Sequence, residues 1–248
     1  MNKNTTRTSR IACALGAGAL LALGALSAPA AATAAPATQQ SALTATEQSD
    51  LAQFWTDNGV DQATQDKLLA NVDAGIMPQS VVGGAEPTST SSTDAEGTTT
   101  TTDVYPDGSL SVSSAEYPVT FAEGEVGTRA ITGCEAVTGS GFAQRNNCNV
   151  SGTNGVVSLG FIASYTLVNG GYDYITNHHT PLILLCAPGT CSDPGFTQYV
   201  EREGVNGPAG VTMTTVYSAA DYGSISNILN LQVGGDAAST SFSPSVIE

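Results

Sequence analysis

The stretch VVSLGFIASYTLV, residues 156–168, decides the fold class that we predict for this chain. From Val157 onward its apolar residues occupy every second position, and small or polar residues such as Ser158 and Thr166 lie between them. Successive side chains of a β-strand point to opposite faces, so this alternation predicts a strand with one apolar face. That face would hold Val157, Leu159, Phe161, Ala163, Tyr165 and Leu167.

Shorter alternating runs continue toward the C-terminus. They are FTQYVERE (196–203), VTMTTVY (211–217) and ILNLQV (228–233), each preceded or followed by Gly or Asn. The run LILLC (182–186) is apolar throughout and predicts a strand buried on both faces. Strands at such regular spacing, with no helical pattern between them, point to a sandwich or a barrel. We predict a disulfide-bonded antiparallel β-sandwich over residues 103–248.

Two short helical patterns precede the strands. Apolar residues recur at helical spacing in both: Leu51, Phe54 and Trp55 in the first, and Leu68, Leu69 and Val72 in the second. Asp61 is a suitable N-cap for the second helix, and Gly59 and Gly75 can end the two helices. We therefore predict a small N-terminal helical hairpin over residues 45–82. It must close on itself or dock on the sandwich, because neither helix is long enough to be stable alone. The predicted fold class is α+β by domain.

Two segments predict little structure of their own. Residues 83–102, GGAEPTSTSSTDAEGTTTTT, contain no large apolar side chain. This composition predicts a Ser/Thr-rich linker between hairpin and sandwich, whose threonines could run into an edge strand. Residues 35–44 form a short segment of Ala, Pro, Gln and Ser character that we expect to be disordered.

The first 34 residues have the pattern of a secretory signal peptide. Basic residues lie within positions 3–10, an apolar run follows over positions 11–26, and A-T-A at 32–34 offers small side chains to signal peptidase. We predict cleavage after residue 34, with Ala30 and Ala31 as alternative sites. No later segment is apolar enough to span a bilayer, so we expect an extracellular protein with no membrane span.

The net charge of the chain limits the classes of partner that we expect. The chain has 7 Lys and Arg against 22 Asp and Glu, a formal net charge of −15. Removal of the signal peptide would leave 4 basic residues against the same 22 acidic ones, a net charge of −18. Nucleic acids and anionic membranes are bound by dense cationic side chains, so this acidity argues against both. The expected partner is an extracellular protein or glycan, and the sequence does not specify the oligomeric state.

Four cysteines remain after the predicted cleavage: Cys134, Cys148, Cys186 and Cys191. An even number of cysteines in an oxidising compartment predicts disulfide bonds. Turn residues lie inside each neighbouring pair, Gly-Ser-Gly at 139–141 and Pro-Gly at 188–189. They favour the local bridges Cys134–Cys148 and Cys186–Cys191, with crossed pairing between distant strands as the alternative.

The only two histidines, His178 and His179, lie close to Cys186 and Cys191 in the sequence. A zinc site there would need thiolates in an oxidising compartment, and neighbours on a strand point to opposite faces, so we predict no metal site. The chain has no G-x-S-x-G motif, and we predict no catalytic residue and no cofactor. The candidate ligand contacts are Tyr172, Tyr174, His178 and His179. The two tyrosines share a strand face and, if exposed, could stack on a sugar ring.

These segments together resemble a group of secreted proteins of actinobacteria. The best-matched pieces are TQDKLL (64–69) and NGVVSLGF (154–161), and the resemblance extends from about Asp50 to Ala238. It implies export and a β-rich C-terminal domain. It implies no activity, ligand or catalytic residue, because the group has none established.

We therefore expect a secreted, non-catalytic extracellular binding or surface-associated protein. Two alternatives stay open. One is an inhibitor or effector that presents the loop between Cys186 and Cys191 to a protein partner, since a closed loop is preorganised for binding. The other is an extracellular hydrolase in which a carboxylate meets His178 or His179 in a cleft.

Overall fold

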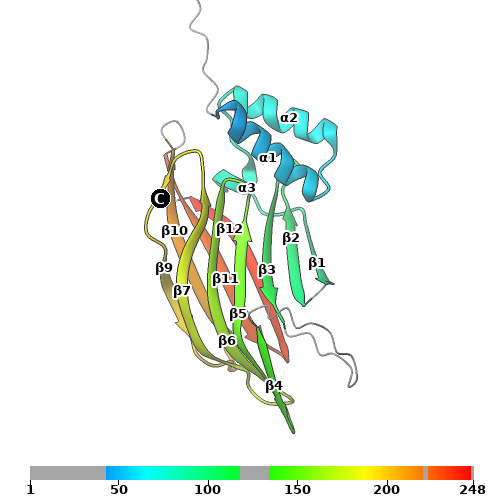
Figure 1. Cartoon of the computed structure of the whole chain (residues 1–248), viewed down its shortest axis with the longest axis vertical. Helices are drawn as coiled ribbons and strands as arrows, with labels where there is room; N and C mark the ends of the chain where they lie inside the picture. Colours follow the sequence, from blue (N-terminus) through cyan, green and yellow to red (C-terminus); the bar gives the residue numbers. More distant parts are fainter. Residues whose placement is uncertain (1–42, 96, 118–133, 220–222, 247–248) are drawn as a thin grey trace, which may run out of the picture. The chain divides into compact units, whose positions relative to one another are not determined.

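The computed structural model (Figure 1) describes residues 43–95, 97–117, 134–219 and 223–246. The predicted signal peptide and most of the predicted disordered segment lie outside the described residues. The helices are α1 (Ala45–Asp57), α2 (Gln62–Asp73) and α3 (Gln79–Val82). The strands are β1 (Ser89–Ala95), β2 (Thr98–Val104), β3 (Leu110–Glu116), β4 (Glu135–Gly139), β5 (Phe142–Thr153), β6 (Val157–Val168), β7 (Tyr174–Cys186), β8 (Thr190–Cys191), β9 (Gly195–Val200), β10 (Ala209–Ala219), β11 (Gly223–Gly234) and β12 (Ala237–Val246).

The strands form two sheets, which we call sheet A and sheet B. Sheet A has seven strands in the order β1-β2-β3-β5-β6-β7, with β4 also paired to β5. Sheet B has five strands in the order β12-β11-β10-β8, with β9 also paired to β10. All of these pairs are antiparallel. The prediction of an antiparallel, β-rich fold is confirmed.

The two sheets pack face to face and share one core. In β6 the alternation predicted from the sequence is observed, because all of its predicted apolar positions are buried except the half-buried Leu167. Phe242 of β12 lies over Gly152 of β5, where an added Cβ would come within 2.6 Å of the Phe242 ring. The Ser111 hydroxyl of β3 donates to the Phe242 carbonyl at 2.8 Å. The inner faces of the two sheets therefore form one continuous hydrophobic core.

Side chains of the helices belong to the same hydrophobic core. Thr44 and Glu47 form a capping box at the start of α1, and Asp61 caps α2 by accepting from the Thr64 N–H at 3.1 Å. Trp55 of α1 is 0% exposed. Leu51 of the same helix lies against the turn between β5 and β6, where a Cβ on Gly155 would come within 2.7 Å of its Cδ1 atom. Helix α1 is thus docked on the sandwich.

The structure differs from the expected linker at residues 83–102. Most of this segment forms β1 and β2, which extend sheet A outward from β3. Threonine is β-branched and has a high strand propensity, and ladder hydrogen bonds need no apolar side chain. The edge strand allowed for at the threonines of this segment is present, but the strand structure is more extensive than expected, since β1 precedes β2 and forms the edge. Sheet A begins at Ser89, ahead of the sandwich boundary predicted at residue 103.

The expectation that LILLC is buried on both faces is wrong. Strand β7 lies at the edge of sheet A, where its ladder partner is β6; its first residue, Tyr174, also forms an isolated bridge with Arg202. The pairing of β7 with β6 shifts register near Leu184, so that three leucines of the run reach the outer surface of the sheet. Leu182, Leu184 and Leu185 are 48%, 59% and 40% exposed. A continuous apolar run cannot distinguish an edge strand with a bulge from a central strand.

Candidate functional site

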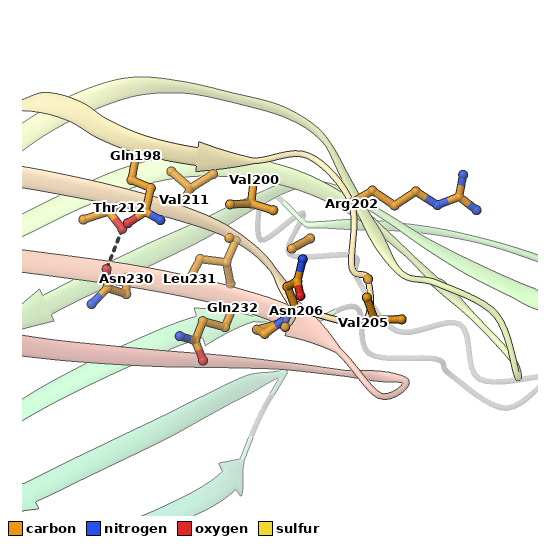
Figure 2. Close-up of a pocket in the computed structure, with 15 residues that line it drawn as sticks. Gln198, Val200, Arg202, Val205, Asn206, Val211, Thr212, Asn230, Leu231 and Gln232 are labelled. Atoms are coloured by element: carbon orange, nitrogen blue, oxygen red, sulfur yellow. Dashed lines mark hydrogen bonds between the residues drawn. The ribbon is translucent and has the colours of Figure 1, made fainter.

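A concave site lies on the outer face of sheet B. It is a hollow of about 490 Å³ over the ends of β9, β10 and β11, bounded on one side by the loop that follows β9. Figure 2 shows Gln198, Thr212 and Asn230 in one row, with Val200 and Gln232 beyond them and the Arg202 side chain directed away. Four of these six side chains, those of Gln198, Thr212, Asn230 and Gln232, carry uncharged hydrogen-bonding groups.

Strand alternation places these polar groups outside. On β10 the side chains of Val211 and Met213 enter the core, which turns Thr212 outward between them. On β11 the buried Leu229 and Leu231 turn Asn230 outward in the same way. Antiparallel register then sets Thr212 directly opposite Asn230. The row results from the pairing itself and lies on rigid strands.

Hydrogen bonds fix the orientation of this row. The Thr212 hydroxyl donates to Asn230 Oδ1 at 2.8 Å, and Asn230 Nδ2 donates to the Ser241 hydroxyl of β12 at 3.3 Å. The side-chain amides of Gln198 and Gln232 make no hydrogen bond within the part of the chain that the structure describes. Each amide offers both donors and an acceptor to a ligand.

The loop over the hollow is short and closed. Gly204 and Gly207 exchange two backbone hydrogen bonds, of 2.9 and 3.1 Å. Val205 at its tip is 91% exposed. Gly207 has a φ of 138°, which a residue with a Cβ rarely adopts, so this tight turn depends on glycine.

Two carboxylates fasten this loop to the end of the sandwich. The fully buried Asp173 accepts from the backbone N–H groups of Val168 at 2.6 Å and Asp236 at 2.9 Å. Glu203 accepts from the N–H groups of Gly235 and Asp173, both at 3.1 Å. Three loops are therefore tied together, and the hollow exists before any ligand arrives.

The outward positions of β10, β11 and β12 carry no charge, and Arg202 is the one charged residue among the described residues that line the hollow. Outward-facing positions alternate along β10 from Gly210 to Ser218, along β11 from Ser224 to Gly234, and along β12 from Ala237 to Ser245. Within these described stretches, every one of them is Gly, Ala, Ser, Thr, Asn, Gln, Val or Ile. The chain as a whole has a net charge of −15, but these outward positions carry none of it, and they suit a ligand without charge.

The residues named from the sequence are not gathered at the hollow. Tyr172 is 46% exposed, and the Arg202 guanidinium carbon lies 5.9 Å from the centre of its ring. Tyr174 lies opposite Arg202 in an isolated bridge. His178 and His179 pair with the buried Ala163 and with Ile162 and so face opposite sides of sheet A. They do not form a common site.

His178 is half-buried where β7 of sheet A lies beside β9 of sheet B. Its ring lies 4.6 Å from that of Phe196 and 4.5 Å from that of Tyr199, both on β9. His179 Nδ1 lies 2.7 Å from the Thr180 hydroxyl on the outer face. The contacts of His178 are thus those of a packed aromatic ring, and the geometry gives no support to a hydrolase centred on it.

Acidic pH is expected to weaken the packing of His178. Desolvation first, and then the neighbouring His179, lower the pKa of its imidazole from the ordinary 6.5. The unfolded state then binds the proton more readily, so the stability from this site is present above about pH 6.5 and is lost as the pH falls below it. In thermal unfolding, the difference in melting temperature between the native protein and His178→Gln should be smaller at about pH 5.5 than at about pH 8. His179→Gln is the control, and an equal narrowing in that variant would contradict the assignment.

Both predicted disulfides are present. Cys134 is bonded to Cys148, and Cys186 to Cys191, so the local pairing is confirmed and the crossed alternative is excluded. The loop closed by the second bridge is held against β10, since the Tyr217 hydroxyl donates to the Pro188 carbonyl and Cys191 pairs with Tyr217. A loop bound down in this way gives little support to an inhibitor that inserts it into a partner.

Two further features are absent from the described residues. Among the described residues, no group of three or more His, Cys, Asp or Glu side chains is placed to hold a metal ion. Over the same ranges, no helix is both long and apolar enough to cross a membrane.

Comparisons with known proteins add no assignment: no family model, no curated protein and no solved structure matches this chain.

The residues that line the hollow were missed at the sequence level. VTMTTVY and ILNLQV were recognised as strands, and their alternation already placed Thr212, Asn230 and Gln232 on a solvent face. The available signal was the absence of charge on those positions in a strongly acidic chain. Register, which no single strand pattern specifies, was needed to bring them together.

Proposed function

We propose that the protein is an exported, non-catalytic binding protein, of the actinobacterial secreted group that it resembles, and that the hollow on sheet B binds an uncharged glycan. The supporting observation is the row Gln198, Thr212, Asn230, with Gln232 beside it: amides and a hydroxyl on rigid strands, with no charge among them. Sugar hydroxyls donate and accept at the same atom, and side-chain amides match them in both roles.

The apolar part of the site fits the same ligand class. Val200 is 40% exposed and lies beside Gln198 and Gln232. A sugar ring presents C–H groups on its faces and hydroxyls at its edge, so a small apolar contact among amides matches a single ring. Ligand pockets typically combine such apolar surface with a few convergent polar groups.

The chain's charge narrows the choice of glycan. A net charge of −15, or −18 after the predicted cleavage, repels polyanions at low ionic strength. An uncharged polysaccharide has no such penalty. The two disulfides are consistent with an oxidising compartment, where such polymers occur.

Binding measurements with the hollow altered test this proposal. We expect the protein to bind at least one soluble neutral polysaccharide from a panel of glucan, mannan and galactan, and not the polyanion alginate. The double variant Gln198→Ala, Gln232→Ala should bind about 10-fold more weakly, the equivalent of about 1.4 kcal/mol from lost hydrogen bonds. Isothermal titration calorimetry on the folded proteins gives the dissociation constants of the native protein and of the double variant.

The control lies on the same face of sheet B. Ser218 and Ser224 hydrogen-bond each other at 3.0 Å, at the other end of β10 and β11 from the hollow. Ser218→Ala with Ser224→Ala should change the dissociation constant less than about 2-fold. Failure to bind any neutral polymer of the panel, or equal losses in the two double variants, would refute the proposal.

A further inference from the structure

The β1–β2 hairpin carries a dense set of exposed hydroxyl groups. From Ser89 to Thr93 five consecutive residues of β1 are Ser or Thr, and every residue of that strand is exposed. Five consecutive threonines, Thr98–Thr102, follow on β2 and are half-buried. Because all of β1 is exposed, neither of its faces is covered by sheet B, and side chains on both faces reach solvent.

Few of these hydroxyls have a structural role. Thr90 donates to Asp103 at 2.5 Å and Thr99 to Asp94 at 2.6 Å. The others make no hydrogen bond within the described ranges; they are Ser89, Ser91, Ser92, Thr93, Thr98, Thr100, Thr101 and Thr102. Packing and hydrogen bonding therefore do not explain why hydroxyls occupy nearly every position.

The two edges of sheet A are protected in different ways. Strand β7, at one edge, has three register shifts and contains Pro181, both of which hinder pairing with another strand. Strand β1, at the other edge, pairs with β2 in continuous register, and over its seven residues it has no proline, no lysine and no bulge. A regular edge strand of mostly Ser and Thr, with one charged residue, is a template for strand addition from another chain.

We propose that the hydroxyls of the β1–β2 hairpin, above all those of Ser89–Thr93, are acceptor sites for O-glycosylation. Ser/Thr-rich exposed segments beside a proline, here Pro87, are the composition on which O-linked sugars are carried. Bulky hydrophilic groups on both faces of β1 would block the approach of a second strand. The modification thus supplies to this edge the protection that bulges and Pro181 give to β7. It is independent of the glycan-binding function proposed for sheet B.

The chemistry needs a transferase and an activated sugar. The hydroxyl oxygen of an acceptor attacks the anomeric carbon of a sugar phosphate donor, either a nucleotide sugar or a polyprenyl-phosphate sugar. The bond between that carbon and the phosphate oxygen breaks as the new C–O bond forms. The phosphate leaves with the bonding electron pair, and the hydroxyl proton passes to a base on the transferase. No electron transfer is involved.

Mass spectrometry of the protein from its own source organism tests this proposal. Cleavage before aspartate releases residues 73–93 and 94–102, which separate the hydroxyls of β1 from those of β2. We expect the 73–93 peptide to be heavier than its sequence by one or more whole sugar residues. Electron-transfer fragmentation should place them within 89–93. An unmodified mass for both peptides, or sugars confined to other parts of the chain, would overturn the proposal.

A pair of variants adds a second readout. Replacement of all five hydroxyl residues from Ser89 to Thr93 by alanine should remove the added mass from this peptide. Ser114 and Ser151, whose hydroxyls lie 2.9 Å apart on central strands of sheet A, provide the control, and Ser114→Ala with Ser151→Ala should leave the added mass unchanged. Retention of the full added mass in the five-fold variant would also overturn the proposal. The peptide map of the native protein decides the question even if that variant is not produced.

Discussion

Replacing Trp55 by alanine is expected to lower the free energy of unfolding by about 4 kcal/mol, the range found for large aromatic truncations in cores. Trp55 is 0% exposed and is the largest of the fully buried side chains. It lies in the same core as the strands, so its loss should lower the stability of the whole sandwich. Far-UV circular dichroism during urea unfolding measures this, since the variant has no tryptophan to follow by fluorescence.

A phenylalanine at the same position separates ring packing from polarity. The indole N–H of Trp55 is buried and has no hydrogen-bond partner within the described residues. Trp55→Phe removes this unsatisfied donor and keeps an aromatic ring, so we expect a cost below about 2 kcal/mol. Ile76→Ala, at a site 57% exposed, should cost less than about 0.5 kcal/mol. A loss below about 1 kcal/mol for Trp55→Ala would show that α1 is not docked on the strands.

Replacing Asn154 by alanine is expected to cost about 4 kcal/mol as well, because several buried groups lose their partners at once. Its side-chain oxygen accepts from the N–H groups of Val156 at 3.1 Å and Val157 at 2.9 Å. Its amide nitrogen donates to the Ser80 carbonyl at 2.9 Å and to the Asn227 side-chain oxygen at 3.3 Å. One buried amide thus joins the β5–β6 turn to α3 and to sheet B.

An exposed asparagine on β5 is the matched control for Asn154. Asn149 donates its amide to Glu116 at the surface, at 2.9 Å, and Asn149→Ala should cost less than about 1 kcal/mol. Asn154→Asp keeps the shape and both acceptor positions but replaces the donating amide by oxygen, so it should be about as harmful as alanine. Equal stability of Asn154→Asp and the native protein by urea unfolding would show that the two donated bonds contribute nothing.

The sequence predicted local elements well wherever periodicity and burial agree. The alternation in residues 156–168 identified the inner face of β6, because that strand is central in sheet A and covered by sheet B. The sequence pattern did not identify β7 as an edge strand. The apolar run of β7 indicated burial, but a bulge in this strand turns its leucines outward. β1 has no apolar run, because neither of its faces is buried. Edge position depends on which strands pair, and side-chain polarity on one strand carries little information about pairing.

The candidate site was the least predictable part. Glu203 and Asp173 are ordinary acidic residues in the sequence, yet between them they accept four backbone hydrogen bonds that shape the loop over the hollow. The histidines drew attention because they are rare in this chain, and they are separated by the most elementary property of a strand, the alternation of its faces. Local disulfide pairing was predictable because turn residues lie inside each cysteine pair.

The order of the strands has a consequence for how the chain folds. Most strands pair with a neighbour in sequence, as β1, β2 and β3 do, and as β10, β11 and β12 do. Such meanders close short loops at small entropic cost and are expected to form early. The sheets are joined by distant contacts such as that between Ser111 and Phe242, 131 residues apart. Closure of the sandwich should therefore limit the folding rate, and until it occurs two half-formed sheets expose their apolar faces, the interval in which the chain is most exposed to aggregation.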